Sequence, residues 1–195
     1  MSNLHRGQAT KLLLSRITDQ PILGGIGSPT YDLYGAGDRE RNLYTWGAMG
    51  MISSMGLGLA VARPDLTVIV LDGDGSILMN LGSLATIARQ APPNLVHIVW
   101  DDQVYETTGR QPTHTAAGTD LAGIAKAAGI PHAVTVDDEA GFTAAIARAL
   151  TEPGPWFIAA KIIPEKGTAR PPRDPIFFKY RFMRAIEQPR SGRSG

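Results

Sequence analysis

Short apolar runs alternate along the chain with stretches of helical periodicity, and this alternation constrains the fold more than any other feature. The apolar runs lie at residues 21–26, 67–71, 95–100, 132–136 and 156–163. Because successive positions in them are largely apolar, they are typical of strands buried on both faces of a parallel sheet. The helical patterns lie at residues 50–62, 80–91, 119–129 and 138–150. The sequence therefore predicts an α/β fold, doubly wound, with a mainly parallel sheet and helices on both faces.

Capping residues support the last two helices. Asp120 can cap the N-terminus of the helix that Gly129 ends. Asp137 or Asp138 can cap the helix that runs to Leu150. Both helices are therefore expected to start at an aspartate.

The length of 195 residues suits one ordinary domain. We expect this domain to cover residues 1–185 and residues 186–195 to form a flexible C-terminal tail. Residues 165–175 are a proline-rich, basic connection, and residues 176–188 carry four aromatic side chains. That many aromatic residues predict that the segment docks, either on this domain or on a partner.

Composition excludes several classes of function. Nineteen basic and eighteen acidic residues give a net charge of +1, which offers no field that favours nucleic acid or an anionic membrane. There is no cysteine, which excludes disulfides, thiol nucleophiles and cysteine-ligated metals for this chain. The first residues hold only a three-leucine apolar run, and no run of about 18 apolar residues occurs. We expect a soluble, cytoplasmic protein that binds a small ligand.

Acidic residues and glycines follow two of the predicted strands. The sequence DGDGS follows the run at 67–71, and Asp101 and Asp102 end the run at 95–100. In an open parallel sheet, ligands bind beyond the carboxyl ends of the strands. Gly73 and Gly75 allow a close approach of the backbone, and a helix predicted to start near Leu78 would direct its first N–H groups to the same place. This arrangement favours an anion.

The carboxylate of Asp74 would repel a phosphate unless a divalent cation lay between them. Mg²⁺ prefers hard oxygen ligands and can join a carboxylate to phosphate oxygens. Asp102, at the end of the neighbouring strand, would supply a second ligand. The two strand ends therefore predict a magnesium-bound phosphate or diphosphate.

Two other interpretations of DGDGS remain open. The simplest is a turn without further function, since Asp and Gly are common after strands. The other is a haloacid-dehalogenase-like phosphatase, in which Asp72 would be the nucleophile and Asp74 the acid/base. That interpretation predicts metal-dependent phosphate release.

Gly73-Asp74-Gly75-Ser76, followed about thirty residues later by Asp101-Asp102, resembles the diphosphate-binding domain of thiamine-diphosphate enzymes. The resemblance implies that Asp74 and Asp102 bind Mg²⁺ through their side chains and Val104 through its carbonyl. Gly75 and Ser76 would contact the diphosphate. The full implied cofactor site comprises Gly47, Ala48, Met49, Gly73, Asp74, Gly75, Ser76, Asp102, Val104 and Tyr105. The sequence departs from the family at Asp102, where asparagine is usual, and the added charge is expected to weaken cofactor binding or to alter the metal preference.

Residues 42–62 are similar to the segment that these enzymes place beneath the rings of the cofactor. The resemblance implies that the carbonyl of Gly47 accepts a hydrogen bond from the aminopyrimidine and that Met49 holds the cofactor in a bent shape. Three glycines, Gly50, Gly56 and Gly58, would let the next helix pack tightly on the sheet. For Met51 and Met55 we expect an ordinary place in the core.

The resemblance covers nearly the whole chain and is closest to the C-terminal half or β subunit of sulfopyruvate and phosphonopyruvate decarboxylases, with residues 105–130 also similar. It implies a 2-oxo acid decarboxylase subunit that needs a partner α subunit, whose pyrimidine domain carries the activating glutamate. The apolar surface around Trp46, Met49 and Met51, extended by residues 177–182, would form the interface of a hetero-oligomer. Other possible functions are another thiamine-dependent lyase or carboligase and a non-catalytic cofactor-binding subunit.

No glutamate of this chain matches the activating role, and we expect solvated surface positions for Glu40, Glu106, Glu139, Glu152, Glu165 and Glu187. Arg110 and His114 follow the second acidic pair. They could meet an anionic substrate group or protonate a reaction intermediate, and a role in a surface turn is an equal alternative.

Overall fold

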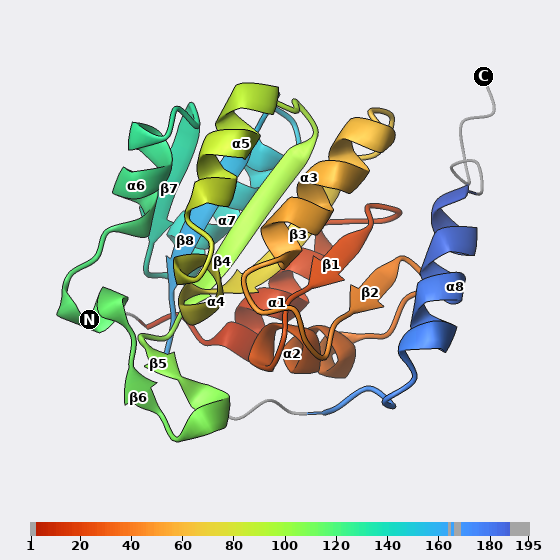
Figure 1. Ribbon diagram of the computed structural model, residues 1–195, viewed down its shortest axis with the longest axis horizontal. Helices are drawn as coiled ribbons and strands as arrows, with labels where there is room; N and C mark the ends of the chain where they lie inside the picture. The colour runs from red at the N-terminus through yellow and green to blue at the C-terminus, as the bar shows by residue number, and fades with distance from the viewer. Residues whose placement is uncertain (1–2, 164, 166–168, 188–195) are drawn as a thin grey trace.

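The protein forms a six-stranded parallel sheet, seen here in a computed structural model that describes residues 3–163, 165 and 169–187 (Figure 1). The strand order is β2-β1-β3-β4-β8-β7, and every neighbouring pair is parallel. The strands are β1 (Ile22–Gly24), β2 (Asn42–Tyr44), β3 (Val68–Gly73), β4 (Leu95–Asp101), β7 (His132–Val136) and β8 (Trp156–Lys161). A separate antiparallel hairpin joins β5 (Val104–Tyr105) to β6 (Gln111–Pro112). The predicted α/β class is confirmed.

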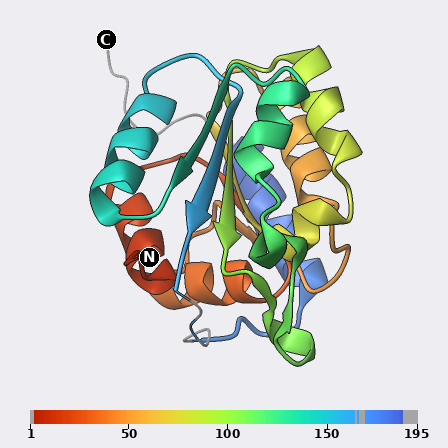
Figure 2. The ribbon, with the colours of Figure 1, turned by 90° about the vertical axis from the view of Figure 1, so that its left-hand side faces the viewer.

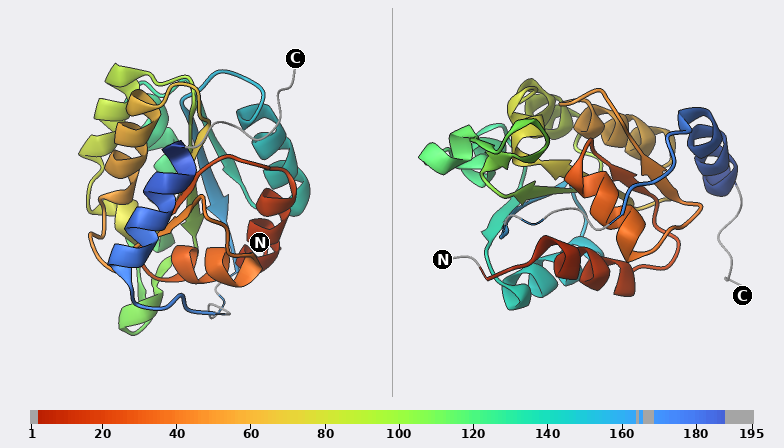
Figure 3. Two further views of the ribbon diagram at one scale, coloured as in Figure 1. Left: turned by 90° about the vertical axis from the view of Figure 1, so that its right-hand side faces the viewer. Right: turned by 90° about the horizontal axis from the view of Figure 1, so that it is seen from below.

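Helices cover both faces of the sheet (Figures 2 and 3). One face packs against α1 (Arg6–Ser15), α2 (Ser28–Ala36) and α7 (Glu139–Ala149). The other packs against α3 (Ile52–Ala62), α5 (Gly82–Gln90) and α6 (Leu121–Ala127). Each face has its own hydrophobic core. Leu13 and Phe142 are buried in the core on the first face, and Ile87 and Leu121 are buried in the core on the second. Because both faces are covered, the central strands are largely apolar, as the sequence pattern predicts, although β3 also contains Asp72 and β4 contains His97.

The sheet has its topological switch between β1 and β3. From β1 the chain moves outward to β2, whereas from β3 it moves in the opposite direction to β4. The loops that follow β1 and β3 therefore separate at neighbouring strand ends and leave a crevice there. The DGDGS sequence follows the apolar core of β3, so the fold places it at this crevice.

The expected strands are found, and two helix caps agree with the sequence. The side chains of Asp120 and Asp138 accept hydrogen bonds from the N–H groups of Gly123 and Gly141, which identifies Asp138 as the cap of α7. Gly129 follows α6 with a φ of 102°, a conformation suited to glycine. Sequence reasoning missed α1, α2 and β2, which are short or have weak periodicity.

The helix expected to begin near Leu78 begins earlier and is divided. A short α4 (Asp74–Leu78) follows Gly73 directly, and α5 begins only at Gly82. The backbone therefore turns into helix within the DGDGS sequence itself. Asp74 is the first residue of α4, so its carboxylate lies at the sheet edge.

Glycine has different roles along α3. A Cβ built on Gly56 would lie 2.1 Å from a methyl group of Val70, so only glycine allows this approach to the sheet. A Cβ on Gly58 would meet no atom within 4 Å, so the expected packing role of Gly58 is wrong. Met51 and Met55 are 47% and 39% exposed, which corrects the expectation that they lie in the core.

Helix α8 (Pro175–Glu187) docks on the domain, as its aromatic content predicts. It runs along the outer strand β2 (Figure 3). Phe178 packs into one core and Phe182 into the other, so the helix covers the edge of the sheet. The helix includes residues 186 and 187, which corrects the expected start of the tail; residues 188–195 lie outside the described residues. In the part of the chain that is described, no helix has both the length and the apolar character needed to cross a membrane.

Candidate functional site

A pocket of about 200 Å³ lies at the switch between β1 and β3. The loop after β1, the β3–α4 turn and the segment after β4 form its walls. Its lining comprises Arg6, Ile26, Gly27, Ser28, Pro29, Met49, Gly73, Asp74, Gly75, Ser76, Trp100, Asp102, Val104, Tyr105, Glu106, Thr107 and Thr108. Eight of the ten predicted cofactor residues are in this lining. Gly47 and Ala48 are solvent-exposed and are not among the described residues that form it.

Asp74 is held at the pocket by two threonines. It is 2% exposed, and its Oδ2 accepts a hydrogen bond from the hydroxyl of Thr113 at 2.5 Å and lies 3.0 Å from that of Thr115. The Thr115 hydroxyl also lies 2.7 Å from Oδ1 of Asp101, whose Oδ2 pairs with Lys161 at 2.5 Å. Since one hydroxyl has one proton, Thr115 cannot donate to Asp74 and Asp101 at once.

Electrostatics make the charged form of Asp74 costly in the chain alone. Burial raises the pKa of Asp74 to about 7, and the neighbouring Asp101 and Asp102 act in the same direction. The hydrogen bond from Thr113 opposes this rise only in part. A cation at the pocket would remove the conflict because it stabilises the ionised form.

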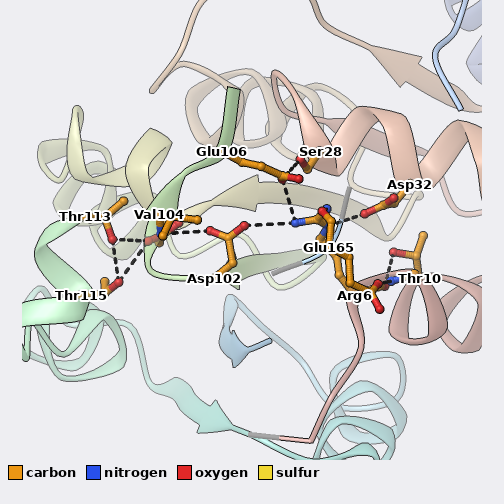
Figure 4. A network of polar contacts seen from close by, with 12 residues as sticks. Arg6, Thr10, Ser28, Asp32, Asp102, Val104, Glu106, Thr113, Thr115 and Glu165 are labelled. Atoms are coloured by element: carbon orange, nitrogen blue, oxygen red, sulfur yellow. Dashed lines mark hydrogen bonds and ion pairs between the residues drawn. The ribbon is translucent and has the colours of Figure 1, made fainter. Parts of the chain in front are cut away.

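Asp102 lies between two donors (Figure 4). Its Oδ1 accepts from the N–H of Val104 at 3.3 Å, and its Oδ2 accepts from Nη1 of Arg6 at 3.2 Å. Burial raises the pKa of the Asp102 carboxyl, and Glu106 and Asp101 add to the rise, while the Val104 N–H and Arg6 oppose it. The second acidic strand end thus lies in the same pocket as the first, as the sequence predicts.

Arg6 is the buried cation of this site, with 1% of its surface exposed. Its guanidinium donates to Asp32 and to the carbonyl oxygen of Glu165, and it lies 3.2 Å from the carboxylate of Glu106. Burial acts against the charge, but Asp32, Glu106 and Asp102 outweigh it and raise the pKa of Arg6. Figure 4 shows Arg6 between these carboxylates.

Two glycines fix the shape of the pocket wall. A Cβ on Gly75 would lie 2.5 Å from the ring of Tyr105, so this ring packs on bare backbone. Gly50 has a φ of 84°, and its N–H donates to the hydroxyl of Ser76 at 2.9 Å, while its carbonyl accepts from Asn80 at 2.9 Å. The segment that carries Met49 is therefore attached to α4 and to the residues that follow it.

Sequence reasoning missed three parts of the site: Arg6, Glu106 and the loop at residues 26–29. The loop had a signal, since Gly27 has a φ of 81° and Pro29 occupies the first turn of α2, a glycine followed by proline at a strand-to-helix turn. No local sequence pattern identifies Arg6 as part of the site, because the partners of its side chain lie 26 to 159 positions away in sequence.

The expectation for Glu106 is wrong. Its side chain is 14% exposed, pairs with Arg6 and accepts a hydrogen bond from Ser28, so it is part of the pocket. Glu165 is also engaged, through His5 and the N–H of Gly7. Glu40, Glu139 and Glu187 lie on the surface as expected, and Glu152 pairs with Arg148 there.

Arg110 and His114 are exposed residues of the lobe that includes the β5–β6 hairpin. Arg110 has a φ of 60°, within the tight connection between the two strands. His114 borders a separate shallow hollow with Pro112 and Thr113. Neither is among the described residues that line the main pocket, so this chain alone favours the surface-turn interpretation for both.

The structure contradicts the phosphatase interpretation. Asp72 is 0% exposed within β3, where its Oδ2 lies 3.2 Å from Nε2 of His97 and its Oδ1 accepts from the N–H of Gly73. A nucleophile must reach its substrate, and Asp72 is not among the described residues that line the pocket. The first aspartate of DGDGS is a core residue, and the second belongs to the site.

Comparison with known protein families agrees with this placement. Residues 26–160 match the family described as thiamine pyrophosphate enzyme, C-terminal TPP binding domain, where TPP is another name for thiamine diphosphate. The chain belongs to the thiamine pyrophosphate enzymes. The match begins at the loop after β1 and runs through most of β8, so it includes both acidic strand ends.

Within this family, relatives of similar length are β subunits. The chain is 45% identical over 168 residues to the sulfopyruvate decarboxylase subunit beta of Methanocaldococcus jannaschii, covering 86% of this chain and 88% of the relative. It is 39% identical over 186 residues to the phosphonopyruvate decarboxylase of Streptomyces viridochromogenes, covering 93% of this chain but only 46% of that protein. The chain thus spans nearly all of a β subunit and less than half of the single-chain relative.

A solved structure shows the same fold. The thiamine diphosphate-dependent 4-hydroxybenzoylformate decarboxylase of Rhodococcus jostii RHA1 aligns with a TM-score of 0.73 at 22% identity. The alignment covers 85% of this chain and 34% of that one. A thiamine pyrophosphate enzyme of that length thus contains this fold as about one third of its chain.

Proposed function

We propose that the chain is the β subunit of a thiamine-diphosphate-dependent 2-oxo acid decarboxylase that acts on sulfopyruvate or phosphonopyruvate. The observation that carries the proposal is a glycine-lined, acidic pocket at the β1/β3 switch, in a chain that matches decarboxylase β subunits over nearly their full length. The products would be CO₂ and the corresponding aldehyde.

The pocket fits a magnesium ion chemically. Its acidic residues, Asp74 and Asp102, offer the hard oxygen atoms that Mg²⁺ prefers. Burial raises the pKa of each, so a nearby cation would stabilise their ionised forms. The described residues contain no group of three or more His, Cys, Asp or Glu side chains arranged to hold a metal. The proposed donor set does not require one, because its third protein ligand is the backbone carbonyl of Val104.

The pocket also fits a diphosphate. Gly73, Gly75 and Ser76 would lie against it, and Gly27 and Ser28, at the start of α2, line the same pocket. Met49 and Tyr105 belong to the apolar part of the lining, together with Ile26, Pro29, Trp100 and Val104, and the rings of the cofactor would lie there. When bound, thiamine diphosphate supplies the nucleophilic carbon and the electron sink that loss of CO₂ from a 2-oxo acid requires. The residues of this chain hold the cofactor, orient it and exclude water from its diphosphate.

The activating glutamate is proposed to come from a partner α subunit. Among the described residues that line the pocket there is one glutamate, Glu106, and its carboxylate pairs with Arg6 and accepts a hydrogen bond from Ser28. Exposed apolar side chains near the pocket, Met51 at 47%, Met55 at 39% and Met79 at 64%, suit a surface that a partner covers. Trp46 is half-buried and packs on Phe178, with ring centroids 5.5 Å apart. The active form would be a hetero-oligomer.

Other functions of the same site make different predictions. A carboligase or another thiamine-dependent lyase would bind the same cofactor but release a different product. A non-catalytic subunit would bind the cofactor and turn over no substrate with any partner. For the substrate, Arg110 and His114 could contact the anionic group only if the partner or a movement of the hairpin brings that group to them.

The test is CO₂ release from sulfopyruvate, phosphonopyruvate and pyruvate, measured for this chain alone and after mixing with a candidate α subunit. We expect no turnover by the chain alone, and turnover of either sulfopyruvate or phosphonopyruvate after mixing. Robust turnover by the chain alone would contradict the partner requirement. Release of a condensation product in place of the aldehyde would favour the carboligase.

A further inference from the structure

Arg6 and Asp102 meet at the pocket from opposite ends of the sequence. Arg6 is the first residue of α1, and Asp102 directly follows β4, 96 positions later. Both are buried, with 1% and 8% of their side chains exposed. The buried carboxylate of Asp102 lines the proposed cofactor site, so its charge beside a diphosphate needs a physical explanation.

The hydrogen bonds around Asp102 distinguish a carboxylate from an amide. Both of its oxygens face donors, Oδ1 the N–H of Val104 at 3.3 Å and Oδ2 the guanidinium of Arg6 at 3.2 Å. An asparagine has one acceptor and one donor end, so either orientation would direct its NH₂ group at a donor. Next to Arg6, position 102 therefore favours aspartate.

Arg6 is itself held in place from other elements. Its Nε donates to Asp32 on α2, its Nη2 donates to the carbonyl of Glu165, and its Nη1 also lies 3.2 Å from Glu106. A planar guanidinium fixed by this many contacts has little freedom to rotate. It can therefore set the position of the carboxylate that it holds.

The charges around Arg6 also support a role for it beside Asp102. Asp32, Asp102 and Glu106 all lie at the guanidinium of Arg6. Arg6 therefore offsets the charge that Asp102 would add beside the diphosphate. Asp102 without Arg6 would leave a buried carboxylate facing an anion.

We propose that Arg6 and Asp102 are a matched pair, in which Arg6 is a positioning residue that orients the Asp102 carboxylate and compensates its charge at the cofactor pocket. This role rests on the proposed function. It differs from the expectation that the added charge of Asp102 weakens cofactor binding. In this chain, asparagine at position 102 is favourable only when Arg6 is also replaced.

The test is a double-mutant cycle read by calorimetric titration of thiamine diphosphate at fixed Mg²⁺, on the chain assembled with its α subunit. Arg6→Met and Asp102→Asn are each expected to weaken binding about tenfold or more. The double variant is expected to bind at least about tenfold more tightly than the product of the two losses predicts. If the affinity loss of the double variant equals the product of the two single losses, Arg6 and Asp102 do not act as a pair.

Two further variants keep the result clear. Arg6→Lys retains the charge in case Arg6→Met does not fold, and its cycle with Asp102→Asn is expected to show the same sign of coupling. Arg181→Met with Asp38→Asn removes an ion pair of 2.7 Å on α8 as a control for stability loss alone, and we expect no change in affinity. If the parent assembly does not bind the cofactor, the proposed function fails and this role with it. If the parent binds and the losses multiply, only the role of the pair fails.

Discussion

Asp72 and Asp74 are two residues apart and both are almost completely buried, yet their surroundings differ. Asp72 lies within β3, and each of its oxygens has a hydrogen-bond partner, the ring of His97 or the N–H of Gly73. Asp74 lies at the sheet edge, where Asp101 and Asp102 raise its pKa beyond the effect of burial. The difference separates a structural carboxylate from one whose charged form is disfavoured in the chain alone and would be stabilised by a cation.

This contrast also explains how one short sequence supports both the fold and the site. Strand β3 alternates its side chains between the two faces, and Asp72 is its last side chain within the sheet. Two residues later the backbone has turned into α4, so Asp74 faces the pocket. Asp72 is expected to contribute to stability, and Asp74 is proposed to contribute to binding at a cost in stability.

The largest change in stability is expected for Asp72→Ala. The Nε2 of His97 would lose its carboxylate partner, and its Nδ1 already has no hydrogen-bond partner among the described residues. We expect the free energy of unfolding to fall by about 2–4 kcal/mol in urea denaturation. Asp72→Asn should cost less because an amide can still hydrogen-bond to the ring. A loss as small as that of a surface substitution would contradict the structural role of Asp72.

A smaller effect is expected from the titration of Asp74 in the chain without metal. Its pKa is about 7 in the folded state and near its ordinary value when unfolded. Because the pKa of Asp74 is higher in the folded state, Asp74 makes its full contribution to the stability of the fold below the unfolded pKa. This contribution is lost as the pH rises through 7. Between pH 5 and pH 8, the parent should lose up to about 2 kcal/mol more than Asp74→Asn in urea unfolding. Equal losses in the two proteins would show that Asp74 is not destabilised at neutral pH.

The smallest effect is expected at Asp138, which caps α7 away from the pocket. Asp138→Ala removes the acceptor of the Gly141 N–H and should lower the free energy of unfolding by about 1 kcal/mol. Cofactor affinity should not change, which makes this variant a control for stability loss that leaves the site intact. A change in affinity would mean that the site depends on global stability, and the contrast between Asp72 and Asp74 would lose its meaning.

Much of the fold could be predicted because the buried strands have a strong apolar pattern. The position of the acidic strand ends could also be predicted, since parallel strands bring their carboxyl ends to one edge of the sheet. Asp74 and Asp102 were therefore placed correctly in one pocket. The caps at Asp120 and Asp138 were predictable because they act within one turn of helix.

The remaining features depend on contacts between distant segments. Arg6 reaches Asp102 only after α1 has packed beside α2, and no local pattern reveals this pairing. Glu106 was taken for a surface charge for the same reason. Met51 and Met55 were wrongly assigned to the core because the helical period does not show which apolar stripe of α3 faces the sheet and which faces outward.

The most direct test of the account is calorimetric titration of thiamine diphosphate into the chain assembled with its α subunit, with and without Mg²⁺. The parent should bind only when Mg²⁺ is present, and Asp74→Ala should lose at least about 100-fold in affinity. Asp72→Ala, measured where it is still folded, should bind like the parent. Binding by Asp74→Ala that equals that of the parent would contradict the assignment of Asp74 as the metal ligand at the cofactor pocket.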